Sequence, residues 1–286
     1  MNRRTDLATL FQANGLDALV MVARNGDELA KLTAQALHEK PHVIVAGGGD
    51  GTISAVASHL VETDTALGVL PLGTLNHFAK DLHIPLDLES AARNIIAGRI
   101  ARIDVGEVNG HIFLNNSSLG LYPSIVRRRE QQQRLGSGKW VAFAWAALAV
   151  LRRYPFLNVR LNADGAQLAR RTPFVFIGNN EYEMSGLNIG ARACLDAGHL
   201  SLYVAHRTGR SGLLRLAVRA LFGRLRDTKD FDALCAGEIW IEAQGKRRLQ
   251  VATDGEVSMM ETPLRYRVRQ KALRVIVPPE DAIVLS

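Results

Sequence analysis

A cluster of glycines around one aspartate directly follows a short aliphatic run. The predicted strand His42–Ala46 carries four consecutive aliphatic residues, which is typical of a strand buried on both faces of a parallel sheet. Gly47, Gly48, Gly49 and Gly51 lack a Cβ, so the backbone can turn sharply and bring its N–H groups close to a ligand. A helix predicted over Ile53–Val61 would add the favourable field of its N-terminus. The segment therefore predicts a phosphate-binding loop.

Two familiar nucleotide loops do not fit this segment. No Gly-Lys-Ser/Thr follows, as a Walker loop requires, and Thr52 stands where the GxGxxG pattern has its third glycine. A carboxylate at Asp50 would repel bare phosphate, so it indicates a divalent cation between the two, or a water held for the metal. The alternative is a structural turn in which Asp50 caps the following helix.

A second glycine turn follows the strand predicted over Leu67–Leu70. Pro71 and Gly73 interrupt the chain before a short helix. Loops that leave parallel strands emerge at the same carboxyl edge of the sheet, where ligands of open α/β folds bind. Thr74 and Asn76 are therefore candidates to hydrogen-bond phosphate or sugar, and capping of the helix by Thr74 is compatible with that role.

The pattern of the chain changes after about residue 102. Before it, strands alternate with helices, from a strand over Ala18–Val22 to a helix over Leu88–Ala97 that Asp87 would cap. Beyond it, strands follow one another from a hairpin at Asn109-Gly110. Further strands are predicted over 157–162, 172–177, 200–205, 238–243, 250–253 and 273–277, and helices over 139–152 and 212–223. The pattern predicts an α/β domain followed by a mainly β domain.

The sequence Asp254-Gly255-Glu256 lies late in the β-rich part. Two carboxylates separated by one glycine at a tight turn can present one group to a substrate hydroxyl and the other to a metal. Alone, Asp-Gly indicates only a turn.

The three segments GGGDGT, PLGTLNHFA and DGE, in this order and with these intervals, resemble the diacylglycerol kinase catalytic-domain family, which includes bacterial lipid kinases and relatives of sphingosine and ceramide kinases. The resemblance covers nearly the whole chain, including residues 113–116, 177–180 and 195–198. It implies an NAD-kinase-like α/β domain with a parallel sheet over residues 1–105 plus about 277–286. Residues 106–276 would form a β-sandwich lipid domain, with a cleft between the two and the final strand returning to the first.

The resemblance also implies a reaction and a site. The protein would be an ATP- and Mg²⁺-dependent kinase that phosphorylates the hydroxyl of a lipid, diacylglycerol or a relative, with catalysis resting on positioning and charge neutralisation. Asp254 would be the general base with Glu256 beside it, and Asp50 and Glu256 would face the metal. The nucleotide would be bound by Gly47, Gly48, Gly49, Asp50, Gly51, Thr52, Gly73, Thr74 and Asn76. The alternatives are an NAD kinase-like or other soluble-acceptor kinase, or a catalytically weak nucleotide-binding regulatory protein.

The chain departs from the family pattern at three places. Relatives usually open with a strand and an Asn-Pro-x-Ser-Gly loop, so we expect that loop to be encoded upstream of Met1 or the enzyme to have lost strength. His77 stands where many members carry aspartate after Asn76. Asp196-Ala197-Gly198 replaces the Asp-Asp-Gly that holds a structural metal in some bacterial members, so that second metal is not expected.

Charge and composition indicate the partners. The net charge of +7 suits an anionic partner, but aromatic residues make up only 6% of the chain, which argues against stacking on nucleic acid. The arginine-rich stretch 127–134 is either a solvated helix face or, with later arginines, a basic surface for anionic lipid headgroups. The apolar run Val141–Leu151 is too short to span a bilayer and predicts a core helix or an interfacial one.

Cysteine usage indicates the compartment. Cys194 and Cys235 have no metal-binding or disulfide spacing, which fits a reduced cytoplasmic environment. We therefore expect a cytoplasmic protein, peripheral at the inner face of the membrane. A homodimer is compatible with the sequence, which does not fix the oligomeric state.

Overall fold

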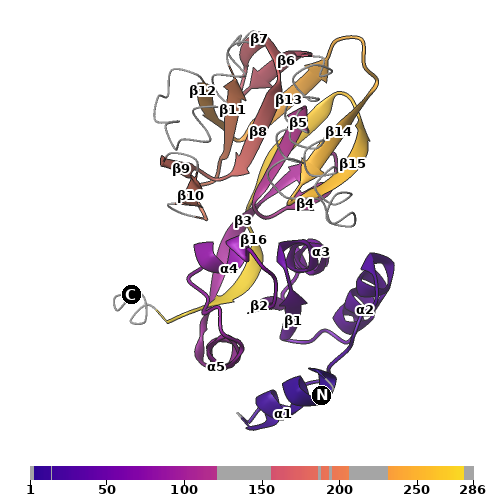
Figure 1. The fold of residues 1–286 in the computed structure, drawn as a ribbon, viewed down its shortest axis with the longest axis vertical. Coiled ribbons are helices and arrows are strands. Elements are labelled where there is room, and N and C mark those ends of the chain that lie inside the picture. The colour runs from indigo at the N-terminus through magenta and orange to yellow at the C-terminus, as the bar shows by residue number, and fades with distance from the viewer. Residues whose placement is uncertain are drawn as a thin grey trace, which may run out of the picture. The chain divides into compact units, whose positions relative to one another are not determined.

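The computed structural model describes residues 3–13, 15–120, 156–185, 188–192, 195–205 and 231–279 (Figure 1). The chain divides into two compact units, one formed by Met1–Val105 with Gln270–Ser286 and the other by Gly106–Arg269. The helices predicted over 139–152 and 212–223, the arginine-rich stretch 127–134 and the apolar run 141–151 lie outside the described residues, so these interpretations stay predictions.

Parallel strands form the centre of the first unit. β1 (Val43–Gly48) pairs in parallel with β2 (Ala66–Pro71) along its whole length. The last part of β16 (Leu264–Val277) pairs in parallel with β2, where Val275 lies opposite Leu67. The final strand thus lies in the sheet of the first unit, as the resemblance implies.

Helices alternate with these strands: α1 (Arg3–Ala13), α2 (Gly26–His38), α3 (Asp50–Leu60), α4 (His77–Asp81) and α5 (Leu88–Ala97). α3 packs on β1 and β2, and α5 packs on β2 (Figure 1). The predicted cap of α5 is confirmed, since the Asp87 side chain accepts a hydrogen bond from Ser90 N at 2.8 Å. The alternation of β and α elements follows from wholly buried strands such as β2, which require cover on both faces.

The strand predicted over Ala18–Val22 is wrong. The structure gives these residues no strand, and Leu19 is 80% exposed. A strand needs a neighbour that takes up its N–H and C=O groups. Among the described residues β1 pairs only with β2, so this segment has no strand beside it.

The second unit contains two antiparallel sheets. In one, β13 (Glu238–Ala243) lies between β16 and β6 (Leu157–Ala163), β6 pairs with β7 (Ala166–Thr172), and β3 (Arg99–Val108) pairs with β16 and β4 (His111–Phe113). In the other, the order is β12 (Phe231–Ala236), β11 (Leu200–Ala205), β8 (Phe174–Asn179), β5 (Asn116–Gly120), β14 (Arg248–Thr253) and β15 (Glu256–Glu261). A separate hairpin joins β9 (Tyr182–Ser185) and β10 (Asn188–Arg192).

Apolar side chains from both sheets form one buried core, which makes this unit a β-sandwich. Phe113 and Tyr266 meet edge to face within it, with ring centroids 6.3 Å apart. The hairpin at Asn109-Gly110 is confirmed, with β3 ending at Val108 and β4 starting at His111. The predicted fold class, a parallel α/β unit and a β-sandwich unit, is confirmed. The core includes Leu119, Val159, Leu161, Ile177, Leu202, Ile239, Ile241, Val251 and Leu264.

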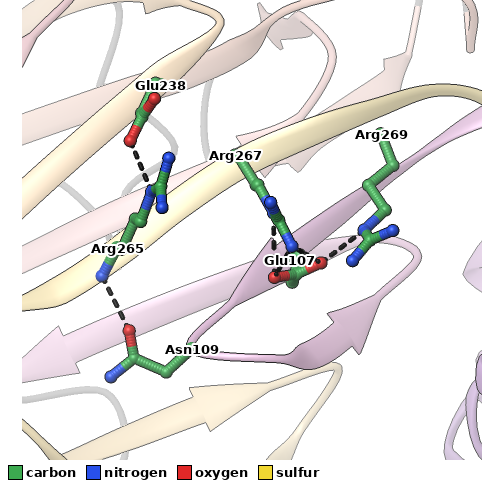
Figure 2. A network of polar contacts seen from close by, with 6 residues as sticks. All are labelled: Glu107, Asn109, Glu238, Arg265, Arg267 and Arg269. Atoms are coloured by element: carbon green, nitrogen blue, oxygen red, sulfur yellow. Dashed lines mark hydrogen bonds and ion pairs between the residues drawn. The ribbon is translucent and has the colours of Figure 1, made fainter.

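A buried carboxylate ties β3 to β16 in the second unit (Figure 2). The side chain of Glu107 is 6% exposed and accepts hydrogen bonds from Arg267, at 2.9 Å from Nε and 3.1 Å from Nη2, and from Arg269. Burial raises the pKa of Glu107, but the hydrogen bonds and charges of the two arginines outweigh it and leave the pKa below its ordinary value. Glu107 therefore stays ionised and holds the two strands together.

We expect Glu107→Gln to lower the free energy of unfolding by about 2 kcal/mol at neutral pH, because the buried charge that accepts from both arginines is lost. Stability from a lowered carboxyl pKa is present above the unfolded-state pKa and lost as pH falls through the folded-state pKa. The difference between wild type and variant should therefore shrink below the ordinary glutamate pKa of 4.5. Urea unfolding across pH measures it. Glu89→Gln, which removes an exposed ion pair with Arg93, is the control and should cost less than about 0.5 kcal/mol.

Candidate active site

The two glycine loops of the first unit contact each other at the carboxyl ends of β1 and β2. Leu72 N donates a hydrogen bond to Gly48 O at 3.0 Å, which extends the pairing of the two strands into the loops. A Cβ on Gly73 would lie 2.5 Å from the Cα of Gly49, closer than side-chain atoms approach backbone. Position 73 therefore requires glycine for the loops to meet.

The side-chain amide of Asn76 makes hydrogen bonds to the backbone of the second loop. Its Oδ1 accepts from Gly73 N at 3.0 Å, and its Nδ2 donates to the carbonyls of Pro71 and Gly73 at 3.2 and 3.0 Å. The residue is 6% exposed and has a positive φ of 50°, which asparagine tolerates better than most residues. Asn76 thus shapes the loop, and its direct contact with a nucleotide stays a prediction. Thr74, beside it, is exposed.

Asp50 links the two loops through a hydrogen bond that the sequence did not predict. Its Oδ1 accepts from Phe78 N, in the first turn of α4, at 3.0 Å. The alternative in which Asp50 caps its own helix does not hold, because Gly49 is the N-cap residue of α3 and Asp50 lies inside the helix. Asp50 instead caps the helix that follows the other loop, which fixes the two loops to each other.

The start of α3 provides the groups that phosphate binding needs. Its N-cap is glycine, with no side-chain hydrogen bond to the first-turn amides. Thr52 packs over Gly48, where an added Cβ would lie 2.6 to 2.7 Å from the Thr52 side chain. First-turn N–H groups without a side-chain cap and the helix dipole favour an anion at this end. The predicted residues Gly47 to Thr52, Gly73 and Asn76 therefore belong to one pair of joined loops.

Asp254 occupies a two-residue turn between β14 and β15 in the second unit. Asp254 and Gly255 have φ values of 48° and 90°, as a type I′ hairpin turn requires. The carboxylate accepts three backbone hydrogen bonds, from Leu114 N at 2.7 Å, Asn115 N at 2.8 Å and Asn116 N at 3.1 Å. The general-base role that the resemblance implies for Asp254 stays a prediction, and the structure shows this carboxylate engaged with backbone.

Glu256 opens β15 two residues later and is exposed. In proteins Mg²⁺ is usually held by one or two carboxylates together with phosphate oxygens and water. The described residues give no hydrogen bond to Asp50 Oδ2 or to the Glu256 carboxylate, so each side chain by itself has an oxygen that could bind a metal, and the predicted role of the two in one metal site stays a prediction. Nor do the described ranges contain a group of three or more His, Cys, Asp or Glu side chains placed to hold a metal by themselves. Substrate phosphates would have to complete the coordination.

Two family models match the chain in succession. The model of the diacylglycerol kinase catalytic domain matches residues 2–108, and that of the YegS C-terminal NAD kinase beta sandwich-like domain matches residues 119–277. The chain belongs to the diacylglycerol kinase catalytic-domain family. The residues matched by the first model include both glycine loops of this chain, and those matched by the second include the Asp254 turn.

Relatives with known names agree with this family. The chain is 29% identical to a protein classed as a YegS-like lipid kinase of Klebsiella pneumoniae strain 342, over 96% of this chain and 91% of that protein. It is 26% identical to a diacylglycerol kinase of Staphylococcus aureus strain JH9, over 86% and 82%. A crystal structure assigned as a diacylglycerol kinase of Bacillus anthracis strain Sterne superposes with a TM-score of 0.72 at 26% identity, covering 94% of this chain and 89% of that one.

Proposed function

We propose that the protein is an ATP-dependent lipid kinase that transfers the γ-phosphoryl group to the hydroxyl of diacylglycerol or a related lipid. The observation that carries the proposal is the presence, in one chain, of both parts of a diacylglycerol kinase-type enzyme. The joined loops of the first unit support nucleotide binding, because α3 starts directly behind them with a glycine N-cap that leaves its first-turn N–H groups without a side-chain acceptor.

The chemistry assigned to the residues is a single in-line displacement. The acceptor oxygen forms a bond to the γ-phosphorus, the bond from that phosphorus to the β–γ bridging oxygen breaks, and ADP leaves. The hydroxyl proton passes to a carboxylate of the Asp254–Glu256 turn. Bound Mg²⁺, held by Asp50 and Glu256, would neutralise phosphate charge, which is the main requirement of such a transfer. The amides of the glycine loops would hold the β- and γ-phosphates.

The proposed lipid substrate and the net charge together suggest where in the cell the protein works. No helix in the described part of the chain has the length and apolar character needed to cross a bilayer. A net charge of +7 would favour peripheral attachment to an anionic membrane surface, and we place the protein in the cytoplasm at the inner face of the membrane. Attachment of this electrostatic kind weakens with salt.

The test is incubation with γ-labelled ATP, Mg²⁺ and separate acceptors: diacylglycerol, a sphingoid base, ceramide and NAD. We expect label in the organic phase with one of the lipids. Label in NADP would instead establish a soluble-acceptor kinase, and ATP that is bound but not consumed would establish a nucleotide-binding regulatory protein.

A further inference from the structure

We propose that a polar pocket of the first unit binds a phosphomonoester through the side chains of Arg102 and Lys271. The pocket has a volume of about 350 Å³. It is lined by residues 62–64, by Arg102 of β3 and by residues 270–272 of β16. All of these residues belong to the first unit. The inference goes beyond the proposed function, because the pocket is separate from the glycine loops that would hold the nucleotide.

The pocket lies at the opposite end of β2 from the second glycine loop. Residues 62–64 connect α3 to the first residue of β2, whereas Gly73 follows the last residue of that strand. β2 is six residues long, which separates its two ends by about 20 Å at the usual rise of a strand. An anion bound in this pocket is therefore distinct from a phosphate bound at the glycine loops.

Two residues with left-handed backbone shape the pocket. Glu62 and Lys271 have φ values of 60° and 50°, and Glu62 N donates to Ala272 O at 2.7 Å. Lys271 N donates at 2.8 Å to Oδ1 of Asp104, which is fully buried in β3. This backbone conformation is unfavourable for residues with a side chain and persists only where surrounding contacts hold it. The hydrogen bonds of the fold therefore fix the backbone on both sides of the pocket.

The charges around the pocket leave two cations without a carboxylate. Asp64 is already paired with Arg274, with 3.2 Å between Oδ1 and Nη1. Within the described part of the chain, no ion pair or hydrogen bond engages the side chain of Arg102 or Lys271, and both residues are exposed. Nε of Arg274 is buried and has no acceptor among the described residues. Even with Glu62 counted, these groups carry three positive and two negative charges.

The two cations suit a phosphate group. The planar guanidinium of arginine matches the oxygens of a phosphate, and the ammonium of lysine adds a second positive charge. A phosphomonoester carries about −1.5 to −2 charges at neutral pH, so two cations neutralise it, whereas a carboxylate would leave one of them unmatched. The volume is near the lower end of the roughly 300 to 1,000 Å³ of ligand pockets, which favours a phosphate on a small organic group.

The experiment is a titration of ¹⁵N-labelled protein with glycerol 3-phosphate, followed by the amide signals of Thr63, Lys271 and Ala272. We expect saturable shifts at these amides, and weaker binding of acetate, which has a single negative charge. Arg102→Gln and Lys271→Gln should each weaken the binding of glycerol 3-phosphate at least about tenfold, the scale for loss of one charged hydrogen bond. Absence of saturable shifts at the three amides, or shifts at Gly49 and not at them, would overturn the proposal.

Lys40→Gln is the matched control for Lys271→Gln. Lys40 is also an exposed lysine of the first unit with a left-handed backbone, φ 49°, but it does not line the pocket. Glutamine keeps the backbone N–H of Lys271 that binds Asp104, so both variants should retain the fold, which their amide spectra show. Binding should stay at the wild-type value in Lys40→Gln. Equal weakening in Lys40→Gln and Lys271→Gln would contradict the assignment, because the effect would then report only net charge.

A water-soluble phosphomonoester and the headgroup of a lipid phosphate present the same group, and vesicles distinguish them. The probe is cosedimentation with phosphatidylcholine vesicles that contain phosphatidic acid. Less cosedimentation of Arg102→Gln and Lys271→Gln than of Lys40→Gln would assign the pocket to a lipid headgroup, and equal cosedimentation of the three would assign it to a soluble phosphomonoester. The titration needs neither ATP nor a lipid acceptor, so its outcome does not depend on whether the protein is a kinase.

Discussion

Replacing Gly73 with alanine should weaken ATP binding by about 10- to 100-fold. The added methyl group would lie 2.5 Å from Gly49 Cα and 2.7 Å from Asn76 Oδ1, so backbone on one side and a buried amide on the other would have to move. Overpacking of this kind costs about 1 to 3 kcal/mol, and each 1.4 kcal/mol is a factor of ten in affinity. Because the strain falls on the contact between the loops, it should appear in nucleotide affinity, measured by isothermal titration calorimetry.

Alanine variants at two other glycines of the first unit are controls for the ATP affinity of Gly73→Ala. A Cβ on Gly49 would lie 3.5 Å from Gly73 Cα, an ordinary contact, so Gly49→Ala tests the same contact from the other side and should weaken binding less than Gly73→Ala. Gly26 has open space around its Cβ position, so Gly26→Ala should bind ATP like the wild type. Wild-type affinity in Gly73→Ala would show that the contact between the loops does not shape the nucleotide site.

Local patterns predicted the first unit well because its strands are aliphatic runs and its turns carry their own signals, although β2 is wholly buried whereas β1 has only Ala46 buried, contrary to the expected burial of β1 on both faces. The aliphatic runs at β1 and β2 and the glycines after them are contained in a few neighbouring residues. The same holds for Asp87, whose hydrogen bond to Ser90 N spans three positions. The segment Ala18–Val22 has a similar aliphatic pattern, yet a strand there depends on a partner that the local sequence does not supply.

In the second unit the local signal was weaker. Only residues 273–277 of β16 were predicted, although the strand runs over Leu264–Val277. Its first half alternates buried Leu264 and Tyr266 with Arg265 and Arg267, and the arginines obscured the apolar face. Those arginines form ion pairs with Glu238 and Glu107 from adjacent strands (Figure 2). Pairing of this kind depends on positions far apart in the sequence.

In the candidate site, too, features set by neighbouring residues were predicted and contacts between distant positions were not. The glycine loops were predicted from local sequence, but the hydrogen bonds that organise them were not. Asp50 reaches Phe78 across 28 positions, and Asp254 reaches Leu114–Asn116 across 138 to 140. The sequence identified these aspartates as functional candidates, whereas only the structure shows that each also binds backbone. A substitution at either one therefore changes two properties at once, and its effects need variants that separate them.

At Asp50, the variants Asp50→Asn and Asp50→Ala separate the carboxylate charge from the hydrogen bond to Phe78 N. Asparagine retains an oxygen that can accept from Phe78 N, so Asp50→Asn should keep the loops joined and remove only the negative charge. We expect turnover to fall about 100-fold, the scale for loss of one electrostatic contact to the transition state. Unfolding free energy should stay within about 0.5 kcal/mol of the wild type. Turnover with labelled ATP over a range of Mg²⁺ concentrations measures the first effect, and urea unfolding measures the second.

Asp50→Ala removes the charge and the hydrogen bond together. Phe78 N would lose its acceptor at the first turn of α4, which should cost about 1 kcal/mol of stability beyond Asp50→Asn. ATP affinity should also fall in the alanine variant, because the second loop then loses one of its links to the first and keeps contacts such as Leu72 N to Gly48 O. Full turnover in Asp50→Asn, with destabilisation in Asp50→Ala alone, would make Asp50 a cap and remove it from the metal site. The reverse outcome, equal stability and equal inactivity, would make the carboxylate charge its only essential property.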